Sequence, residues 1–457
     1  MSLVGALACG TACGSSGSNA TDSYAGSAGA GRDTDAAGGP DDGAAGGGSA
    51  SGQGGEATAV GGTGQGGLLS ASAGEGEVAG GAADRPVVGE QVFDREMLHE
   101  IAITVAPADL PSLDEHSDTR VPATLVFDGV TLEKVGVRNK GATSFQPTSQ
   151  KPSFSIKINE LVAGQRLDGL KKLVLNNTVQ DPTWATEILT YDTYRKAGLP
   201  APRVAHAVVS LNGVPKGIYT IIEAVNAQFL ASHYGASNDQ GNLYEGPWDF
   251  DQPVADADLK DELSELRTRD DLDALTAVVL SEADAQYPER LSEVLDVDQF
   301  IKGYAVDVVT VAWDGYAYAA WNFYLYDNPR DGRFVFLPAG ANWPYFREQP
   351  GAAATLDPFQ LPQLWGPDSP AGFLAKQRVL QIPALRARLE QHLAEVTELA
   401  FDVPALHAEL ERLEQVLHST HRDDAATTSD LQQFDDHIGM AYEFIEARKQ
   451  YLLTRVP

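Results

Sequence analysis

The chain has 457 residues, with 33 Lys and Arg against 64 Asp and Glu, and a formal net charge of −31 at pH 7. This excess of acids excludes a surface that follows DNA or RNA phosphates, and it favours either solubility alone or a basic partner. Both cysteines, Cys9 and Cys13, lie at the extreme N-terminus. The rest of the chain therefore has no disulfide framework, no thiolate nucleophile and no cysteine-based metal site.

The N-terminal residues form a short apolar run, SLVGALA, that ends in small residues directly before Cys9. This pattern is similar to a bacterial lipobox, in which the cysteine becomes the lipidated first residue of the mature protein. We predict that residues 1–13 are such a segment, with Cys9 as the lipidation site and Cys13 as a weaker second candidate. The expected location is then the cell envelope or the extracellular side, as a lipid-anchored bacterial lipoprotein. An ordinary apolar N-terminus of a cytoplasmic protein is the alternative.

Residues 14–85 form a low-complexity tract of Gly, Ser, Ala and Asp, and 25 of the 45 glycines precede residue 86. Such a tract cannot bury enough apolar surface to offset the entropy of ordering, so we predict a disordered tether. Its reach is about 45–50 Å for a flexible Gly-rich chain of this length. Its glycines are not set between a strand and a helix, so they do not form a phosphate-binding loop.

The remaining residues, 86–457, begin with short alternating apolar runs that predict strands. The runs are Ile101–Val105, Val121–Phe127, Lys134–Arg138, Ser153–Ile158, Lys172–Leu175, Ala205–Leu211 and Gly217–Glu223. One helix interrupts them, with Asp181 as the expected N-cap and Gly198 and Pro200 at its end.

Helical patterns dominate the second part of the chain. Helices are expected at Leu259–Arg267, Asp271–Ser281, Val297–Trp313 and from Ala371 onward, with one hairpin at Asn322–Tyr326 and Arg333–Leu337. The length of the chain exceeds what one core usually serves. We therefore predict an α+β, two-lobed fold, with a β-rich N-terminal lobe of one main helix (about 86–225) and a mostly helical C-terminal lobe (226–457).

Eight stretches carry a resemblance to a known family, in the order that the family shows. They are VGVRNKGATSF (135–145), QKPSFSIKI (150–158), GLKKLVLNN (169–177), EILTYDTYRKAGLPAPR (187–203), LNGVPKGIYTIIE (211–223), GNLYEG (241–246), WDGYAYAAWNFYLY (313–326) and FIEARKQYL (444–452). This set, spanning about residues 93–457, resembles the spore coat protein H (CotH) kinase family. The resemblance implies an atypical protein-kinase-like fold and Ser phosphorylation of secreted or surface proteins, with ATP and Mg or another divalent cation.

The resemblance also implies roles on the nucleotide side. Lys157, in the middle of a strand, is expected to contact phosphates and to pair with Glu187 of the helix. Arg138, Lys140 and Lys151 flank a Gly-containing turn that could cap the phosphates. Glu223 lies after the hinge-like strand, where the family has a nucleotide-binding acid. The structural alternatives are a solvated strand lysine with a helix-dipole glutamate, and a plain β-turn with surface bases.

On the transfer side, Asp314 matches the carboxylate of the catalytic loop, and Asn322 resembles the family's metal-binding Asn. The alternative is a helix C-terminal turn with an Asp at its edge. The segment after the strand Arg333–Leu337 departs from the family. Asn342 stands where the family has a metal-binding Asp, and Ala339 replaces a Trp. Asn keeps one oxygen ligand but loses the charge. Asp331 is one acid that could replace it.

These features predict a protein kinase whose substrate is an exported protein, possibly basic, and whose membrane contact is a lipid anchor. No nucleic-acid partner is expected. Two alternatives remain open: a relative that binds nucleotide without transfer, because of Asn342, and a surface adhesin or scaffold.

Overall fold

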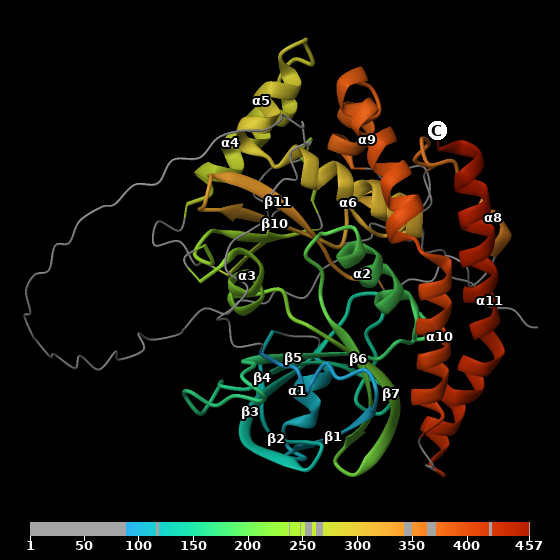
Figure 1. The fold of residues 1–457 in the computed structure, drawn as a ribbon. Helices are drawn as coiled ribbons and strands as arrows, with labels where there is room; N and C mark the ends of the chain where they lie inside the picture. The colour runs from blue at the N-terminus through green and yellow to red at the C-terminus, as the bar shows by residue number, and fades with distance from the viewer. Residues whose placement is uncertain are drawn as a thin grey trace, which may run out of the picture.

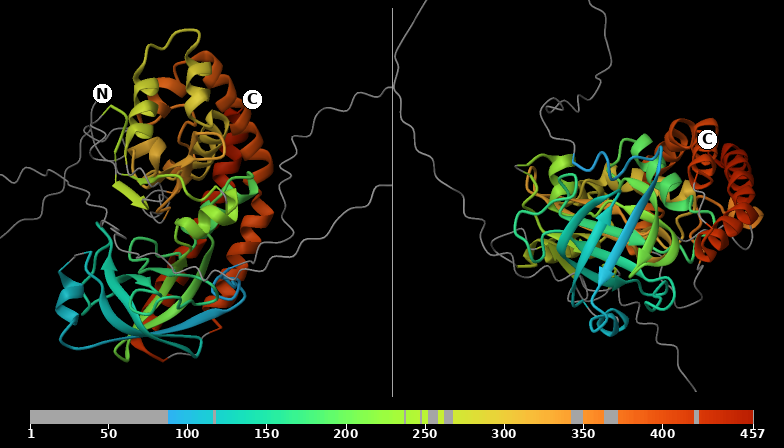
Figure 2. Two further views of the ribbon diagram at one scale, coloured as in Figure 1. Left: turned by 90° about the vertical axis from the view of Figure 1, so that its left-hand side faces the viewer. Right: turned by 90° about the horizontal axis from the view of Figure 1, so that it is seen from below.

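The computed structural model describes residues 88–115, 118–236, 238–246, 248–251, 258–261, 268–341, 350–362, 372–419 and 423–456. The predicted lipobox with Cys9, the tether and Asn342 lie outside the described residues. Figures 1 and 2 show a β-rich N-terminal part below a mostly helical part, with the C-terminal helices along one side.

The N-terminal part is a closed barrel of seven strands in the order β1-β2-β3-β4-β5-β7-β6. Closure comes from parallel pairing of β6 with β1, while the other neighbours are antiparallel. The strands are β1 (Leu98–Val105), β2 (Val121–Phe127), β3 (Val130–Lys140), β4 (Ser153–Lys157), β5 (Lys172–Asn176), β6 (Val204–Leu211) and β7 (Val214–Ile222).

The alternation of side chains along each strand separates two environments. Val135, Val137 and Ile156 belong to the barrel's own apolar core, whereas Ile218 and Ile222 of β7 belong to the core shared with the helical part. The intervening residues of β3 therefore present their polar side chains on the outside of the barrel. This alternation places Lys140 on the outer face.

Helix α2 (Thr186–Lys196) packs between the barrel and helix α6 (Val297–Thr310). It begins later than predicted from Asp181, because Trp184 takes a left-handed backbone conformation with φ near +50°. Asp181 instead closes the turn before the helix, where its carboxylate accepts N–H bonds from Thr183 and Thr186. The predicted N-cap residue therefore stabilises the turn before the helix and is not the residue that caps the helix.

The second part contains a four-stranded sheet in the order β11-β10-β8-β9, surrounded by helices. Its strands are β8 (Leu243–Glu245), β9 (Asp258–Asp261), β10 (Phe323–Asn328) and β11 (Arg333–Pro338). The helices, beside α6, are α3 (Ala227–Tyr234), α4 (Asp270–Leu280), α5 (Tyr287–Val294), α7 (Tyr316–Ala319), α8 (Pro350–Ala354), η3 (Leu374–Val379), α9 (Pro383–Glu395), η4 (Val396–Ala400), α10 (Val403–Leu417) and α11 (Ala425–Arg455).

Two local predictions differ from this structure. The helix expected at Leu259–Arg267 is wrong at its start, because residues 258–261 pair with β8 as strand β9. Strand β8 and the short helices α1 (Leu110–Asp114), α3, α5, α7 and α8 were not predicted. All of these segments are short, and period counting separates helix from strand poorly over so few residues.

The α+β class and the division into a β-rich part and a helical part are confirmed. A closed seven-stranded barrel, however, stands where the kinase-like prediction had an N-terminal lobe. Helices α10 and α11 run beside both parts (Figure 1), and α11 packs on β7 and α8. None of the helices in the described ranges combines the length and the apolarity needed to cross a membrane.

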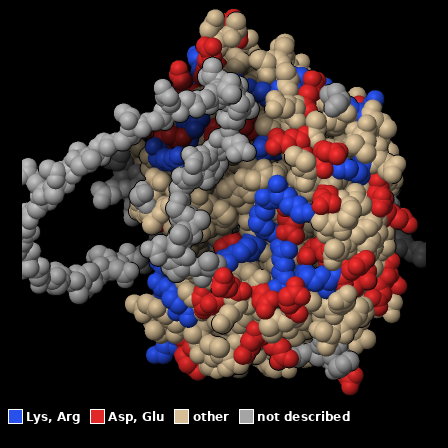
Figure 3. All heavy atoms as spheres, in the orientation of Figure 1, with Lys and Arg blue, Asp and Glu red and all other residues tan. Residues whose placement is uncertain are grey.

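Basic and acidic side chains lie close together on part of the surface. Figure 3 shows Lys and Arg gathered in the middle of one face, with Asp and Glu beside them. Ion pairs also connect elements of the fold: Arg95 binds Asp192 of α2 at 2.6 Å and approaches Glu409 of α10 at 3.6 Å. These pairs tie the start of the barrel to both helices.

Candidate functional site

The loop after α6 carries the predicted Asp314. The residue after the last one of α6 is Val311, a β-branched residue that caps the helix in a left-handed conformation with φ of +56°. Asp314 is 7% exposed, and its carboxylate accepts a hydrogen bond of 2.9 Å from the amide nitrogen of Asn322. Asn322 itself has φ of +46°. Strained conformations of this kind persist only where the surroundings enforce them, and they cluster at functional sites.

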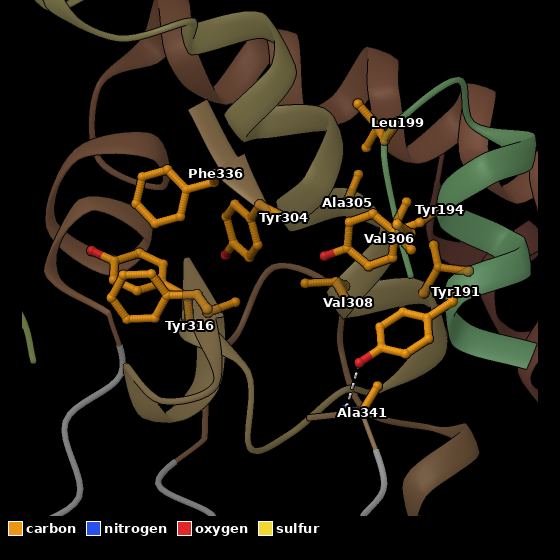
Figure 4. Close-up of a cluster of buried hydrophobic side chains, with 14 of the residues drawn as sticks. Tyr191, Tyr194, Leu199, Tyr304, Ala305, Val306, Val308, Tyr316, Phe336 and Ala341 are labelled. Carbon is orange, nitrogen blue, oxygen red and sulfur yellow. Dashed lines mark hydrogen bonds between the residues drawn. The ribbon is translucent and has the colours of Figure 1, made fainter. Parts of the chain in front are cut away.

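The chain that leads towards Asn342 passes close to both residues. A Cβ atom on Gly340 would lie 2.8 Å from Cγ of Asn322, so only glycine fits there. The next residue, Ala341, donates its N–H to the hydroxyl of Tyr191 on α2 (Figure 4, dashed line). Asn342 is outside the described residues, and its predicted role as a metal ligand stays a prediction.

Glu187 of α2 is buried beside the barrel, with Asn176 of β5 between it and Lys140 of β3. Asn176 donates to Glu187 at 3.1 Å and accepts a hydrogen bond of 2.5 Å from the ammonium of Lys140. The charges of Lys140 and Asp314 both act on Glu187. Hydrogen bonds therefore link Lys140 to Glu187 through Asn176, and Asp314 is near enough for its charge to act on Glu187.

The expected pair of Lys157 with Glu187 is wrong. Lys157 lies 3.4 Å from Glu160 at the far end of β4. In the antiparallel register, Ser153 is opposite Lys140, whereas Lys157 is opposite Gly136. Lys157 is thus displaced along the strand by roughly 13 Å from the position beside Lys140.

The other predicted nucleotide-binding residues have partners of their own. Arg138 lies 3.4 Å from Asp118, and Glu223 binds Arg203 at 2.6 Å. The partner of Lys151 is on α11, where the carboxylate of Asp430 lies 2.7 Å from its ammonium.

Lys151 also lies over aromatic rings, 5.2 Å from that of Trp184 and 5.5 Å from that of Tyr219. Because α11 supplies the carboxylate, this lysine joins the barrel to the C-terminal helix. Lys151 belongs to the loop that was expected to cap phosphates. In the structure it instead forms an ion pair with a carboxylate from a distant part of the chain.

Burial dominates the electrostatics of the site. It raises the pKa of Glu187 to about 8, against the opposing effect of Lys140, and it raises the pKa of Asp314 to about 8. A third carboxyl, Asp307 of α6, accepts a 2.6 Å hydrogen bond from Tyr194, and burial raises its pKa to about 7. Shifts of this size in a cleft are typical of functional sites.

Asn176 and Asp307 were not among the predicted site residues. Asp307 is a lone acid within the apolar run YAVDVVTVAW. A charged residue at a core position of a predicted helix is rarely buried without a purpose, and this signal could have identified it. Asn176 directly follows the strand predicted at Lys172–Leu175 and carried no comparable signal.

Asp314 also lines a small cavity with a volume of about 30 Å³. Tyr194, Tyr304, Asp307 and Asn322 contribute to its wall. Figure 4 shows Tyr194 and Tyr304 among the buried aromatic side chains of this part of the molecule. The space is sufficient for about two water molecules. The cavity is therefore too small to hold a nucleotide.

The residues present fit a divalent cation only in part. Within the described part of the chain, no group of three or more His, Cys, Asp or Glu side chains could hold a metal. Asp314 and the amide oxygen of Asn322 could contribute two oxygen ligands. Mg²⁺ commonly binds through one or two carboxylates, with water and substrate phosphates completing its shell.

Comparison with known proteins identifies one family model, CotH kinase protein, which matches residues 137–452. The inner spore coat protein H of Bacillus subtilis (strain 168) is 22% identical over 362 residues, covering 76% of this chain and 94% of that protein. Among solved structures, the Helicobacter pylori proinflammatory kinase CtkA aligns with a TM-score of 0.27 and 8% identity, covering 65% of this chain and 94% of that chain.

Proposed function

Because the chain belongs to the CotH kinase protein family, we propose that it transfers the γ-phosphoryl group of ATP to a hydroxyl group of an exported protein, with Mg or another divalent cation. The observation that carries this proposal is the meeting of Lys140, Glu187 and Asp314 between the barrel and the helical part. Phosphoryl transfer requires a cation for the phosphates, an acid that orients it and a carboxylate near the attacking hydroxyl. The three side chains match these requirements by chemical type.

In the proposed reaction, Lys140 steadies the phosphates and Glu187, through Asn176, fixes its orientation. Asp314, held by Asn322, accepts the proton of the attacking hydroxyl. The new bond forms between that oxygen and the γ-phosphorus, while the bond to ADP breaks. The divalent cation, when bound, would neutralise charge on the phosphate oxygens.

The test compares two lysines of the same barrel in the full-length protein, by ATP-dependent labelling. Lys140→Met is expected to reduce transfer by about a hundredfold or more, as for removal of a group that stabilises charge in the transition state. Lys157→Met is the matched control, and its rate of transfer should stay within about twofold of the unmodified protein. Lys157 is too far from Glu187 to contact phosphates that are bound beside that residue. A large loss with Lys157→Met and none with Lys140→Met would reverse the assignment.

Loss of transfer with retained nucleotide binding is the second candidate function, and the observation that favours it is Asn342 in the sequence. Asp331 does not replace the missing carboxylate. It lies at the tip of the β10–β11 hairpin, bound to Arg333 at 2.7 Å, whereas Phe323 and Pro338 pair at the other end.

The expected behaviour of this second candidate is detectable ATP binding, weak metal dependence and slow or absent transfer. A neutral amide attracts a hard cation less than a carboxylate does. Asn342→Asp should then increase metal affinity, measured by calorimetry, and also transfer. Equal, high activity in both forms would exclude this candidate.

We also propose the location and partner that the N-terminus suggests. A lipid on Cys9 would anchor the chain at the cell envelope, and the tether would let the kinase domain reach exported proteins. The net charge of −31 favours a basic substrate segment. Mass spectrometry of the mature N-terminus tests the anchor: an unmodified Cys9 in envelope fractions would exclude it.

A further inference from the structure

Arg448 is a buried charge on α11 whose described hydrogen-bond acceptors are all main-chain oxygens. Its side chain is fully buried, and it donates to the carbonyl oxygens of Val308, Val309, Ala354 and Leu356 at 2.7, 3.2, 3.0 and 2.6 Å. Four of the five N–H groups of the guanidinium are thus used. A buried guanidinium is costly unless its donors are satisfied.

The carbonyl groups that Arg448 binds on α6 have lost their normal helical partners. The N–H of Ala312 would ordinarily bond Val308, yet it donates to Asp307. In the same way, the N–H of Trp313 donates to Val311 and not to Val309. The left-handed turn at Val311 causes both changes, so the turn leaves two carbonyls that only an outside donor can satisfy.

The other two carbonyl groups are those of Ala354, at the end of α8, and of Leu356, two residues later. Ala354 is the last residue of α8, and the residue four positions later, Pro358, has no N–H to offer. A positive charge beside the carboxyl ends of two helices is also favoured by their dipoles. Arg448 therefore joins α6, α8 and α11 at one point.

We propose that Arg448 is the positioning residue of the Asp314 loop, because it stabilises the strained end of α6 from which that loop departs. Without the guanidinium, the carbonyls of Val308 and Val309 would be buried and unpaired. Continuing the helix past Val311 would repair them, and that change would move Asp314 away from Asn322. The catalytic consequence rests on the proposed function, whereas the structural consequence does not.

The experiment uses the full-length protein with R448M, R448K and the control R455M. Arg455 also lies on α11 and binds Asp357 at 2.7 Å, near the end of α8, but it is exposed. Hydrogen exchange of residues 306–322 should accelerate by about tenfold or more in R448M, because a local hydrogen-bond network has lost its donor. Exchange in β3 should not change, and R455M should resemble the unmodified protein in both regions.

Kinetics supply the second readout. R448M should reduce the kcat of phosphoryl transfer by about tenfold or more while KM for ATP stays within about twofold, since a misplaced Asp314 affects the chemical step. R448K, with a smaller set of donors, should be intermediate in both readouts. Unchanged exchange at residues 306–322 and unchanged kcat would overturn the proposal, and so would equal acceleration of exchange in β3.

Two further outcomes are also decisive. If R448M does not fold, R448K decides by the same criteria, and failure of both to fold would overturn the proposal, because Arg448 would then stabilise the whole molecule. An unmodified protein without any transfer would refute the proposed function, and the exchange measurement alone would then decide the role of Arg448.

Discussion

Lys140 and Lys151 lie at the two ends of the loop between β3 and β4, and the sequence gives them the same expected role. The structure separates them by their partners. Lys140 binds Asn176 beside Glu187, whereas Lys151 binds Asp430 of α11. The sequence cannot distinguish these lysines, because Asp430 is 279 residues away along the chain.

Lys151→Met is expected to lower the free energy of unfolding by about 2–4 kcal/mol, because removing one partner of a buried ion pair leaves the other charge uncompensated. Nucleotide affinity should stay unchanged. Urea denaturation and calorimetry with ATP measure the two quantities. A large loss of ATP affinity in a fully folded variant would show that Lys151 contributes to nucleotide binding after all.

A double variant provides the control for this prediction. Asp430 also accepts the N–H of Ile218 at 2.7 Å, and an Asn at this position keeps an acceptor there. Lys151→Met combined with Asp430→Asn should therefore recover most of the lost stability. No recovery would show that the contacts of the Lys151 ammonium with the rings of Trp184 and Tyr219, and not its ion pair with Asp430, stabilise the protein.

Several residues of the site could be predicted from the sequence, but which lysine lies beside Glu187 could not. Asp314 and Asn322 are hydrogen-bonded to each other, and both were identified from a single sequence motif. The pairing of Glu187 depends on the register between β3 and β4, which the loop between them sets and which a motif does not encode. The wrong lysine was chosen for that reason.

At the scale of elements, strands with clear alternation were predicted well, such as β2 (Val121–Phe127), whose bounds are the same in the sequence and the structure. The ends of helices were less predictable. Helix α2 begins five residues after its expected cap because a non-glycine residue, Trp184, takes a left-handed conformation. Tertiary packing enforces that conformation: Trp184 is buried and its indole N–H donates to Ile218.

The contact between β7 and α11 depends on a glycine without a side chain. A Cβ atom on Gly217, at φ of +88°, would lie 2.1 Å from the carboxylate of Asp430. Gly217→Ala should therefore destabilise the protein by about 4 kcal/mol or more, through backbone strain and displacement of α11. Thermal unfolding of the full-length protein measures the effect.

Gly213 offers a matched control in the same hairpin, at φ of +76° with no atom near its would-be Cβ. Gly213→Ala should cost only about 1–2 kcal/mol, which is the strain of a left-handed L-residue. Similar losses for the two variants would mean that α11 moves freely away from β7, and that the ion pair of Lys151 contributes little to the docking of α11.

At the scale of the whole molecule, one apolar core reaches from the outer face of the barrel through α2 to α6, α9 and α11. Glu187 and Asp307 are buried at the edge of this core, on α2 and α6 respectively. Charged groups at such positions are retained against their desolvation cost, which is consistent with a functional role. Because both carboxyls are buried, the free energy of unfolding of the chain should depend on pH.

The stability of the protein should fall as pH rises from about 5 to 8. Unfolded, the carboxyls of Asp307 and Glu187 ionise near 3.8 and 4.5, whereas burial raises their pKa values to about 7 and 8 in the folded protein. Between these limits the folded state holds protons that the unfolded state has lost, so each group lowers the free energy of unfolding by at most about 1.4 kcal/mol per pH unit. Asp307→Asn and Glu187→Gln should each flatten this slope in urea denaturation, and the exposed control Glu443→Gln should not. A slope that stays the same in both variants would show that the two carboxyls are already ionised inside the folded protein.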